Sequence, residues 1–548
     1  MSLVLVMGGD VNGLMLCGKR WRHCGGSVPI YRLANHWLAG QPMRLLLGGQ
    51  SMRVLGAIAA LVMLTGASLG RVSMEAAILP PAPVTGDALK PFVRSLGARV
   101  ALAHVRVIDG TGAPALPDRT LLVDNGRIAG ILAAGEQVPA GYALVNLAGR
   151  SVIPGIVGMH DHLYYISRPD LDSAGHSEAP SPLLPQMTFS SARMYLAGGV
   201  TTLRTTGSVE PYTDLNLKRQ IDAGKLPGPH IDVTAPYLEG AGSPFIQMHQ
   251  LTGPDDARRT VDFWADQGAT SFKAYMNITR AELAAAIEAA HSRGLKLTGH
   301  LCSVTYPEAA MLGIDDLEHG FWANTQSDPG KAPDLCPTTA GEPTLMAMTA
   351  GSAQASALIK LLVDRKVALT STLPVFETTS PNYRTLPPRQ MAMLSSQARN
   401  DYWTYRALLL ARTPKRAADA HIRWANELAL ERAFVAAGGL LIAGPDPTGA
   451  GQVLPGFGNQ RAIELLVEAG FTPLEAIRIG TLNGATFLGL AHRIGSIAVG
   501  KNADFVIVKG DPSINIGDIE KVELVMKDGV AFDPDALLED VKGHYGEY

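Results

Sequence analysis

The residues best suited to chemistry are two histidines separated by one residue, His160 and His162, at the end of an apolar run, 152–157. The run predicts a buried strand interrupted by Pro154-Gly155, and residues two apart on a strand point to the same side. Both imidazoles could therefore bind one cation. Two imidazoles alone do not make a metal site, so the remaining nitrogen and oxygen donors must come from elsewhere in the chain.

Such donors follow in order, each at the end of a strand-like segment, as Lys273, His300, His319 and Asp446. Helix-like stretches lie between them, and the clearest begins where Thr279 and Glu282 predict a capping box. Strands that alternate with helices form parallel sheets, and in a (β/α)8 barrel the active site lies at the carboxyl ends of the strands. The pattern predicts an α/β fold, a (β/α)8 TIM barrel. Its strands are expected to end near His160, Arg204, Pro236, Lys273, His300, His319, Leu373 and Asp446.

This ordered set resembles the metal ligands of the amidohydrolase superfamily, specifically its binuclear members with a carboxylated lysine, which include dipeptidases, ochratoxin amidases and imidazolonepropionases. The similarity covers residues 100–532 and includes Asn483-Gly-Ala-Thr-Phe-Leu-Gly-Leu and Gly495-Ser-Ile-Ala-Val-Gly-Lys-Asn-Ala-Asp-Phe-Val-Ile-Val. The resemblance implies two divalent metal ions, with zinc expected because it binds imidazole nitrogen and carboxylate oxygen readily. The implied ligands are His160, His162, Lys273, His300, His319 and Asp446.

Lys273 and Asp446 need separate arguments. An ammonium group has three donors and no acceptor, so Lys273 cannot bind a cation as it stands. The resemblance implies that it reacts with carbon dioxide to form a carbamate that bridges the metals; the alternative is a salt-bridged lysine beside a mononuclear site. Asp446 is expected to bind one metal and to carry a proton from the bridging water to the leaving amine.

Two further residues are candidates for contact with substrate. Tyr275, two residues after Lys273, resembles a position that contacts the carbonyl or carboxylate of substrates in dipeptidase-like relatives, although a packing role is equally open. Arg204 ends the second strand and is a second candidate, but it is followed by Thr205-Thr206 where relatives often have aspartate. His230 and His291 are expected to be structural.

The composition fits a soluble globular enzyme, with a formal net charge of -3 and 47% hydrophobic residues. No basic cluster with interleaved aromatic residues points to a nucleic-acid partner. We expect a metal-dependent hydrolase that cuts a C–N amide bond of a small molecule, either peptide-like or an N-acyl amino acid. The alternatives are hydrolysis of a lactone, a carbamate or urea, or a cyclic amidine, and a non-enzymatic scaffold. The sequence does not distinguish a monomer from a homo-oligomer.

Strand-like segments before and after the barrel predict a second, discontinuous domain. Residues 96–152 and 491–535 are expected to pair into one β-sandwich beside the barrel of 153–490, with a tight turn at Asp124-Asn-Gly. Residues 71–95 are expected to be a linker and 536–548 a C-terminal tail. Substrate specificity is expected in the segments 324–343 and 374–437, because insertions in βα loops shape the pockets of barrel enzymes.

The start of the chain predicts export. Residues 52–70 have a positive start, an apolar centre and small residues at the end, which is typical of a secretory signal peptide. Residues 1–51 form a doubtful upstream extension, and we expect translation to start at Met43 or Met52. The alternative is an uncleaved anchor, for which the apolar stretch is short. The mature protein is expected to be periplasmic or secreted, without membrane contact after cleavage.

The cysteines give weak support for export. Cys302 and Cys336 remain once the upstream extension is set aside. In an oxidising compartment such a pair can form a disulfide. Two unrelated buried thiols are the alternative.

Overall fold

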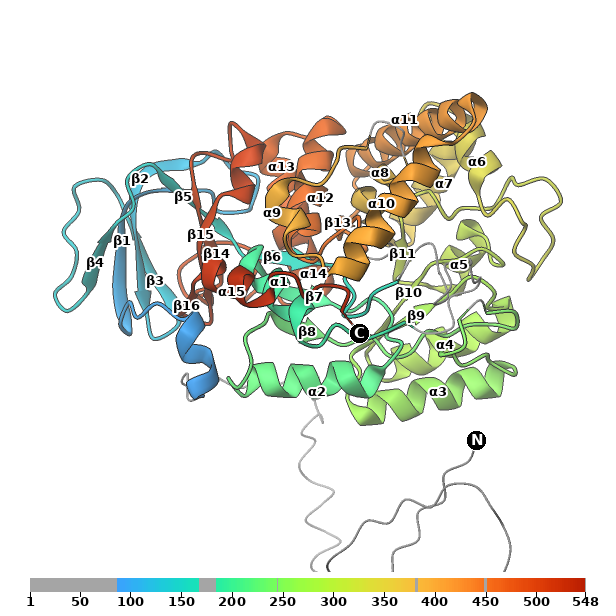
Figure 1. The fold of residues 1–548 in the computed structure, drawn as a ribbon. Coiled ribbons are helices and arrows are strands. Elements are labelled where there is room, and N and C mark those ends of the chain that lie inside the picture. The colour runs from blue at the N-terminus through green and yellow to red at the C-terminus, as the bar shows by residue number, and fades with distance from the viewer. Residues whose placement is uncertain (1–85, 167–183, 244, 380–382, 448–450, 548) are drawn as a thin grey trace, which may run out of the picture. The chain divides into compact units, whose positions relative to one another are not determined.

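The computed structural model describes residues 86–166, 184–243, 245–379, 383–447 and 451–547 (Figure 1). The expected upstream extension, the signal peptide and most of the linker 71–95 lie outside the described residues. The described end of that linker forms a short 3-10 helix, η1 (Asp87–Phe92), whose Phe92 is buried. Across the described ranges, no helix combines the length and the apolar character that crossing a membrane requires.

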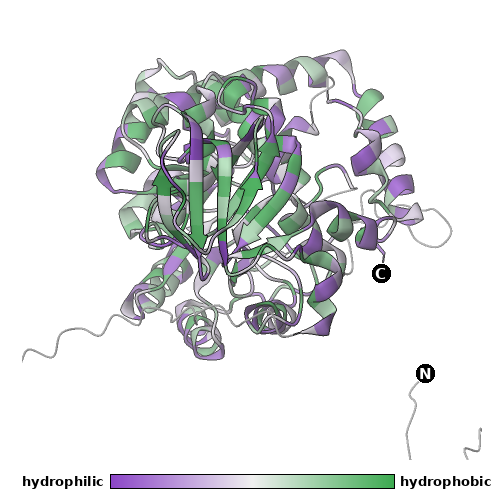
Figure 2. Ribbon diagram, turned by 90° about the vertical axis from the view of Figure 1, so that its left-hand side faces the viewer, coloured by the Kyte–Doolittle hydropathy of each residue, from purple (hydrophilic) through white to green (hydrophobic). Residues whose placement is uncertain are grey.

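An eight-stranded sheet contains strands from both ends of the described chain, in the order β16-β15-β14-β5-β1-β2-β3 with β4 paired to β1. Its strands are β1 (Arg99–Val107), β2 (Leu116–Asp124), β3 (Arg127–Leu132), β4 (Ala143–Asn146), β5 (Arg150–Pro154), β14 (Phe505–Lys509), β15 (Val522–Lys527) and β16 (Val530–Phe532). The two distant segments meet where β5 pairs antiparallel with β14, with Ile153 opposite Val506. Figure 2 views this sheet face on and shows that its strands are mostly hydrophobic. Their side chains form a buried apolar cluster separate from the core of the parallel sheets.

The expected turn joins β2 to β3. Asn125 and Gly126 both have positive φ, 47° and 78°, as a two-residue hairpin turn that matches the twist of its strands requires. The local sequence therefore determines this hairpin.

Eight further strands are all parallel and lie in two sheets, β6-β7-β8 and β13-β12-β11-β10-β9. They are β6 (Ile156–Gly158), β7 (Val200–Arg204), β8 (His230–Asp232), β9 (Ser271–Ala274), β10 (Lys296–Gly299), β11 (Asp316–Glu318), β12 (Ala368–Ser371) and β13 (Leu441–Ala443). They occur where the sequence predicted the strands of the barrel, and helices separate them. The protein thus has a mixed α/β fold.

The helices between these strands pack on a continuous apolar core. They are α1 (Ser190–Ala197), α2 (Pro211–Asp222), α3 (Pro254–Gln267), α4 (Arg280–Ser292), α5 (Tyr306–Leu312), α6 (Glu342–Ala347), α7 (Ala353–Asp364), α8 (Leu373–Glu377), α9 (Pro388–Met391), α10 (Ser396–Leu410) and α11 (Pro414–Ala436). After β13 come α12 (Phe457–Glu468), α13 (Pro473–Arg478), the π-helical turn η2 (Ile479–Asn483), α14 (Gly484–Phe487), the 3-10 helix η3 (Ile516–Glu520) and α15 (Pro534–Val541). The expected capping box is present at α4, where Thr279 and Glu282 bond reciprocally.

One local expectation needs correction. The apolar run before His160 is two strands rather than one, since β5 belongs to the large sheet and β6 to a parallel sheet. Gly155 separates them, and a Cβ atom there would collide with Thr201.

The expected C-terminal tail packs on the rest of the described structure. Helix α15 contacts α1, and Tyr545 is buried, with its backbone N–H donating to the carbonyl of Met393.

Candidate active site

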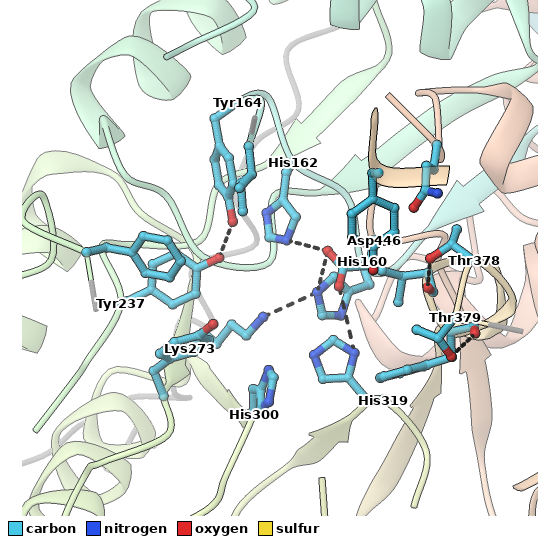
Figure 3. Close-up of a pocket in the computed structure, with 17 residues that line it drawn as sticks. His160, His162, Tyr164, Tyr237, Lys273, His300, His319, Thr378, Thr379 and Asp446 are labelled. Carbon is cyan, nitrogen blue, oxygen red and sulfur yellow. Dashed lines mark hydrogen bonds and ion pairs between the residues drawn. The ribbon is translucent and has the colours of Figure 1, made fainter. Parts of the chain in front are cut away.

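All six predicted metal ligands line one pocket of about 220 Å³ at the carboxyl ends of the parallel strands (Figure 3). His160 and His162 follow β6, Lys273 lies within β9, His300 and His319 come directly after β10 and β11, and Asp446 follows β13. The sequence suggested that His160 and His162 lie on a strand. They lie instead in the irregular segment just beyond β6. The remaining wall is mostly aromatic and includes Tyr164, Tyr237, Phe245, Tyr275, Phe376 and Tyr405.

Asp446 lies beside three of the four imidazoles. Its Oδ1 is 3.2 Å from His162 Nε2 and 3.7 Å from His160 Nε2, and its Oδ2 is 3.9 Å from His319 Nδ1. The rings of His300 and His319 lie 4.3 Å apart. Candidate ligand atoms of His160, His319 and Asp446 are all within 4.8 Å of one another. Imidazole nitrogen and carboxylate oxygen at this spacing fit a divalent metal such as zinc.

The backbone is unusual at two of these residues. His319 and Asp446 have φ values of 70° and 51°, in the left-handed region that side chains other than glycine rarely adopt. Asp446 N–H donates to the carbonyl of His160 at 3.0 Å, which ties the end of β13 to the end of β6. Such conformations persist where surrounding contacts hold them, and they are common at functional sites.

Burial keeps the imidazoles neutral. It lowers the pKa values of His160 and His319 well below the ordinary range, and burial together with the charge of Lys273 lowers the pKa of His300 to about 3. A neutral imidazole has the free lone pair that a metal needs. Burial alone would raise the pKa of Asp446, but the neighbouring His160 and His162, with Lys273, hold it well below the usual value. Asp446 is therefore ionised at neutral pH.

Lys273 is 1% exposed, and its Nζ lies 3.3 Å from His160 Nε2. The same Nζ donates to the carbonyl of Thr206 at 3.2 Å and lies over the ring of Tyr237. Burial lowers the pKa of Lys273 to about 8, although the charges of Glu318 and Asp446 oppose the shift. A neutral, nucleophilic amine is thus accessible near physiological pH.

The pocket includes one expected substrate residue and two that sequence reasoning missed. Tyr275 lines it, as predicted, between the rings of Tyr237 and His300. Tyr164 and Tyr237 join their hydroxyl groups across the pocket at 2.5 Å. Tyr164 follows His162 by two residues, and this repeat of the His160 to His162 spacing could have indicated it.

Arg204 does not line the pocket, which corrects its expected role. It is 1% exposed, and its guanidinium donates to Asp316 at 2.8 Å and to Glu318 at 2.9 Å beneath the site. Glu318 in turn lies 2.6 Å from Nδ1 of His160. Sequence reasoning missed both carboxylates, although acidic residues two apart in a buried strand before His319 were a usable signal.

Of the two regions expected to confer specificity, 374–437 lines the pocket and 324–343 does not. Helix α8 and the residues after it contribute Val375, Phe376, Thr378 and Thr379 to the pocket, and Tyr405 comes from α10. No residue of 324–343, a segment the structure describes throughout, is among those lining it. That segment instead carries Cys336, which forms a disulfide with Cys302, two residues after His300.

The two histidines expected to be structural lie outside the pocket. His291 pairs with Asp315 at 2.9 Å, and His230 pairs with Asp528 at 2.7 Å. His230 and Asp528 also cluster with Asp504, at a spacing that could hold a metal. Lys527 lies 3.3 Å from Asp528 and already supplies a positive charge there, so an ion-pair network accounts for the group.

One family model and several solved structures are similar to this chain. The model of the Amidohydrolase family matches residues 385–532. A search of curated proteins found no match.

Solved structures are similar over most of the chain. A putative prolidase from Bifidobacterium longum has a TM-score of 0.58 at 23% identity, covering 82% of this chain and 100% of its own. A Xaa-Pro dipeptidase with bound methionine in the active site has a TM-score of 0.59 at 19% identity, with 79% and 100% covered. The ochratoxinase of A. niger has a TM-score of 0.57 at 16% identity, with 82% and 100% covered. At these identities the likeness shows a shared fold, and together with the family match it confirms the resemblance of this chain to the amidohydrolase superfamily.

Proposed function

We propose that the protein is a metal-dependent hydrolase that cleaves a C–N amide bond in a small molecule. The observation that carries the proposal is the convergence of four neutral imidazoles, a buried lysine and an ionised aspartate in one pocket. The similar structures bear names of amide-cleaving enzymes, namely prolidase, Xaa-Pro dipeptidase and ochratoxinase. We propose a peptide-like or N-acyl amino acid substrate for this chain.

We also propose that the two parallel sheets close into a (β/α)8 barrel flanked by a β-sandwich. Parallel bridges between Thr234 and Ser271 and between Leu238 and Ala274 support a connection between the β8 and β9 sides. On the other side, Met159 N–H donates to the carbonyl of Ala443 at 2.9 Å, which supports a connection between β6 and β13. Polar residues at the carboxyl ends of such strands would then ring one active site.

Two divalent ions, zinc being the first choice, would be held by His160, His162, His300, His319 and Asp446, and by Lys273 once it carries a carbamate. A bound metal lowers the pKa of water to about 7 and polarises a carbonyl group. For Lys273 to contribute oxygen ligands, its neutral Nζ would bond to the carbon of carbon dioxide while one C–O π bond breaks and its electron pair moves to oxygen. The released N–H proton would pass to water, which leaves a carbamate. The lowered pKa of about 8 supports this reaction, because only the neutral amine has a lone pair.

Other steps of the proposed reaction, proton transfer and substrate binding, are assigned to residues of the pocket. Asp446, ionised and 9% exposed, would accept the proton of the attacking water and pass it to the leaving nitrogen. The aromatic wall around Tyr164, Tyr237 and Tyr275 would hold the substrate and exclude bulk water. Exclusion of water strengthens the electrostatic interactions within the pocket.

Export is a further part of the proposal, with residues 52–70 as a cleaved signal peptide and the mature chain periplasmic or secreted. The disulfide between Cys302 and Cys336 supports it, because disulfides persist in oxidising compartments.

A hydrolysis screen with metal analysis tests the activity. Protein prepared without residues 1–70, with bicarbonate and with zinc, manganese or cobalt, would be offered N-acyl amino acids, dipeptides, lactones, carbamates and cyclic amidines. We expect two metals per chain and hydrolysis of amides. Hydrolysis of only the other classes would favour the alternative reaction, and protein that binds no metal would favour a scaffold.

A further inference from the structure

Beneath the pocket lies a buried polar network that the proposed chemistry does not use. Glu318 is fully buried, and its Oε2 lies 2.6 Å from Nδ1 of His160. At this distance, with the carboxylate as acceptor, His160 donates its Nδ1–H. The lone pair of His160 is then on Nε2, the nitrogen that lies 3.3 Å from Lys273 Nζ and 3.7 Å from Asp446 Oδ1.

The other oxygen of Glu318 is fixed by two donors. Thr298 Oγ1 donates to Glu318 Oε1 at 2.6 Å, and Nη2 of Arg204 donates to it at 2.9 Å. These donors come from different strands, β10 and β7, so the carboxylate cannot turn without breaking contacts to both. Glu318 is therefore held in the one orientation that meets His160.

Arg204 also fixes the backbone that carries the imidazole. Its Nε and Nη2 both donate to the carbonyl of Met159, at 2.9 and 2.6 Å. Met159 immediately precedes His160. One guanidinium thus holds both the carboxylate that orients the imidazole and the peptide unit from which the imidazole projects.

We propose that Glu318 is a positioning residue that fixes the tautomer and ring orientation of His160 for metal binding, and that Arg204 holds Glu318 in place. The inference rests on the metal centre of the proposed function and assigns a role within it. Histidines that bind metals commonly donate their other ring N–H to such a carboxylate, and loss of the partner typically lowers metal affinity about 10- to 100-fold.

The chain offers a matched control in Asp316, two residues before Glu318 on β11. Asp316 is equally buried and also accepts from Arg204, at 2.8 Å. Its other donor is the hydroxyl of Thr370, at 2.8 Å, rather than an imidazole. Asp316→Asn and Glu318→Gln therefore remove the same charge from the same network, but only the second changes the partner of His160.

The experiment measures zinc affinity by competition with a chelator for full-length wild type, Glu318→Gln and Asp316→Asn, with thermal unfolding of each metal-free protein. We expect Glu318→Gln to weaken binding about 10- to 100-fold, Asp316→Asn to stay near wild type, and Glu318→Asp to recover part of the loss. Equal affinities for the Glu318→Gln and Asp316→Asn variants would overturn the inference. A wild type that binds no zinc would instead overturn the proposed function.

A second measurement remains decisive if the variants do not fold. The 15N chemical shifts of the histidine rings in metal-free wild type report which ring nitrogen carries the proton. We expect His160 to carry it on Nδ1. A proton on Nε2 would mean that Glu318 does not orient this ring, and the inference would be abandoned.

Discussion

Replacement of Asp446 by asparagine separates its two expected roles, as a metal ligand and as a proton carrier. The amide has nearly the same shape as the carboxylate and keeps an oxygen that can coordinate weakly. It cannot accept a proton at neutral pH. The change therefore removes a base and one negative charge from a site in which His162 Nε2 lies only 3.2 Å away.

The size of the effect follows from the position of the carboxylate. Its side chain is only 13% exposed, so water cannot easily take over the proton. General acid–base transfer contributes about 10²- to 10⁴-fold to a rate, which corresponds to about 2.7 to 5.4 kcal/mol of activation free energy. We expect kcat to fall by that factor while much of the metal is retained, because the imidazole ligands are unchanged.

The assay combines metal content with turnover of the best amide from the screen. A control is Asp161→Asn, the same substitution at a buried acid that accepts hydrogen bonds from Asn459 and does not line the pocket, and whose pKa burial raises to about 7. Turnover of this control should remain within about tenfold of wild type, as expected for a group outside the proton path. An Asp446→Asn variant that keeps its metals and most of its activity would refute the assignment of Asp446 as the proton carrier.

Five other outcomes are expected. Bicarbonate added during metal loading should raise the activity of wild type but not of Lys273→Arg, because a guanidinium stays charged and cannot form a carbamate. The activation by bicarbonate, measured from pH 6 to 9, should increase with pH through about 8, because the fraction of Lys273 in the neutral amine form rises as the pH passes its pKa. Activation that is independent of pH would contradict this. The Cys302→Ser variant should lower the free energy of unfolding by about 3 to 4 kcal/mol, because the bond closes a loop of 34 residues, and an unchanged denaturation midpoint would argue against the bond. Arg204→Met should destabilise the fold by about 3 to 5 kcal/mol through two unpaired buried carboxylates, and a variant of normal stability with a raised KM would restore the expected substrate contact. N-terminal sequencing of exported protein should find a first residue between Ala67 and Val72, and recovery of residues 1–51 would exclude signal cleavage.

Local features could be predicted because their causes are local. The capping box of Thr279 and Glu282 depends on residues three apart, and the turn at Asn125 and Gly126 depends on φ values that few residue types adopt. The six pocket residues could also be predicted from the sequence, because each lies at the end of a strand-like segment. Parallel strands bring their carboxyl ends to one edge, so polar residues at successive strand ends meet whatever the intervening helices do.

The errors arose where a side chain finds its partner far along the chain. Arg204 ends a strand as an active-site residue would, but Asp316 and Glu318 lie more than 100 residues later, and only the pairing of strands brings them together. The break between β5 and β6 lies close to the expected boundary between residues 152 and 153, and β5 pairs with β14 from the segment expected to join it. What the apolar run does not indicate is the register of that pairing, because β14 lies at the other end of the chain.

That pairing has a consequence for how the protein reaches its folded state. Ser151 on β5 donates to the carbonyl of Gly510, 359 residues away, so the large sheet can close only after almost the whole chain has been synthesised. Contacts of such long sequence separation form slowly, and until then β5 presents an unpaired edge to other chains. A chain truncated before β14 would keep all six pocket residues yet retain that open edge permanently, and aggregation rather than loss of ligands would be its main defect.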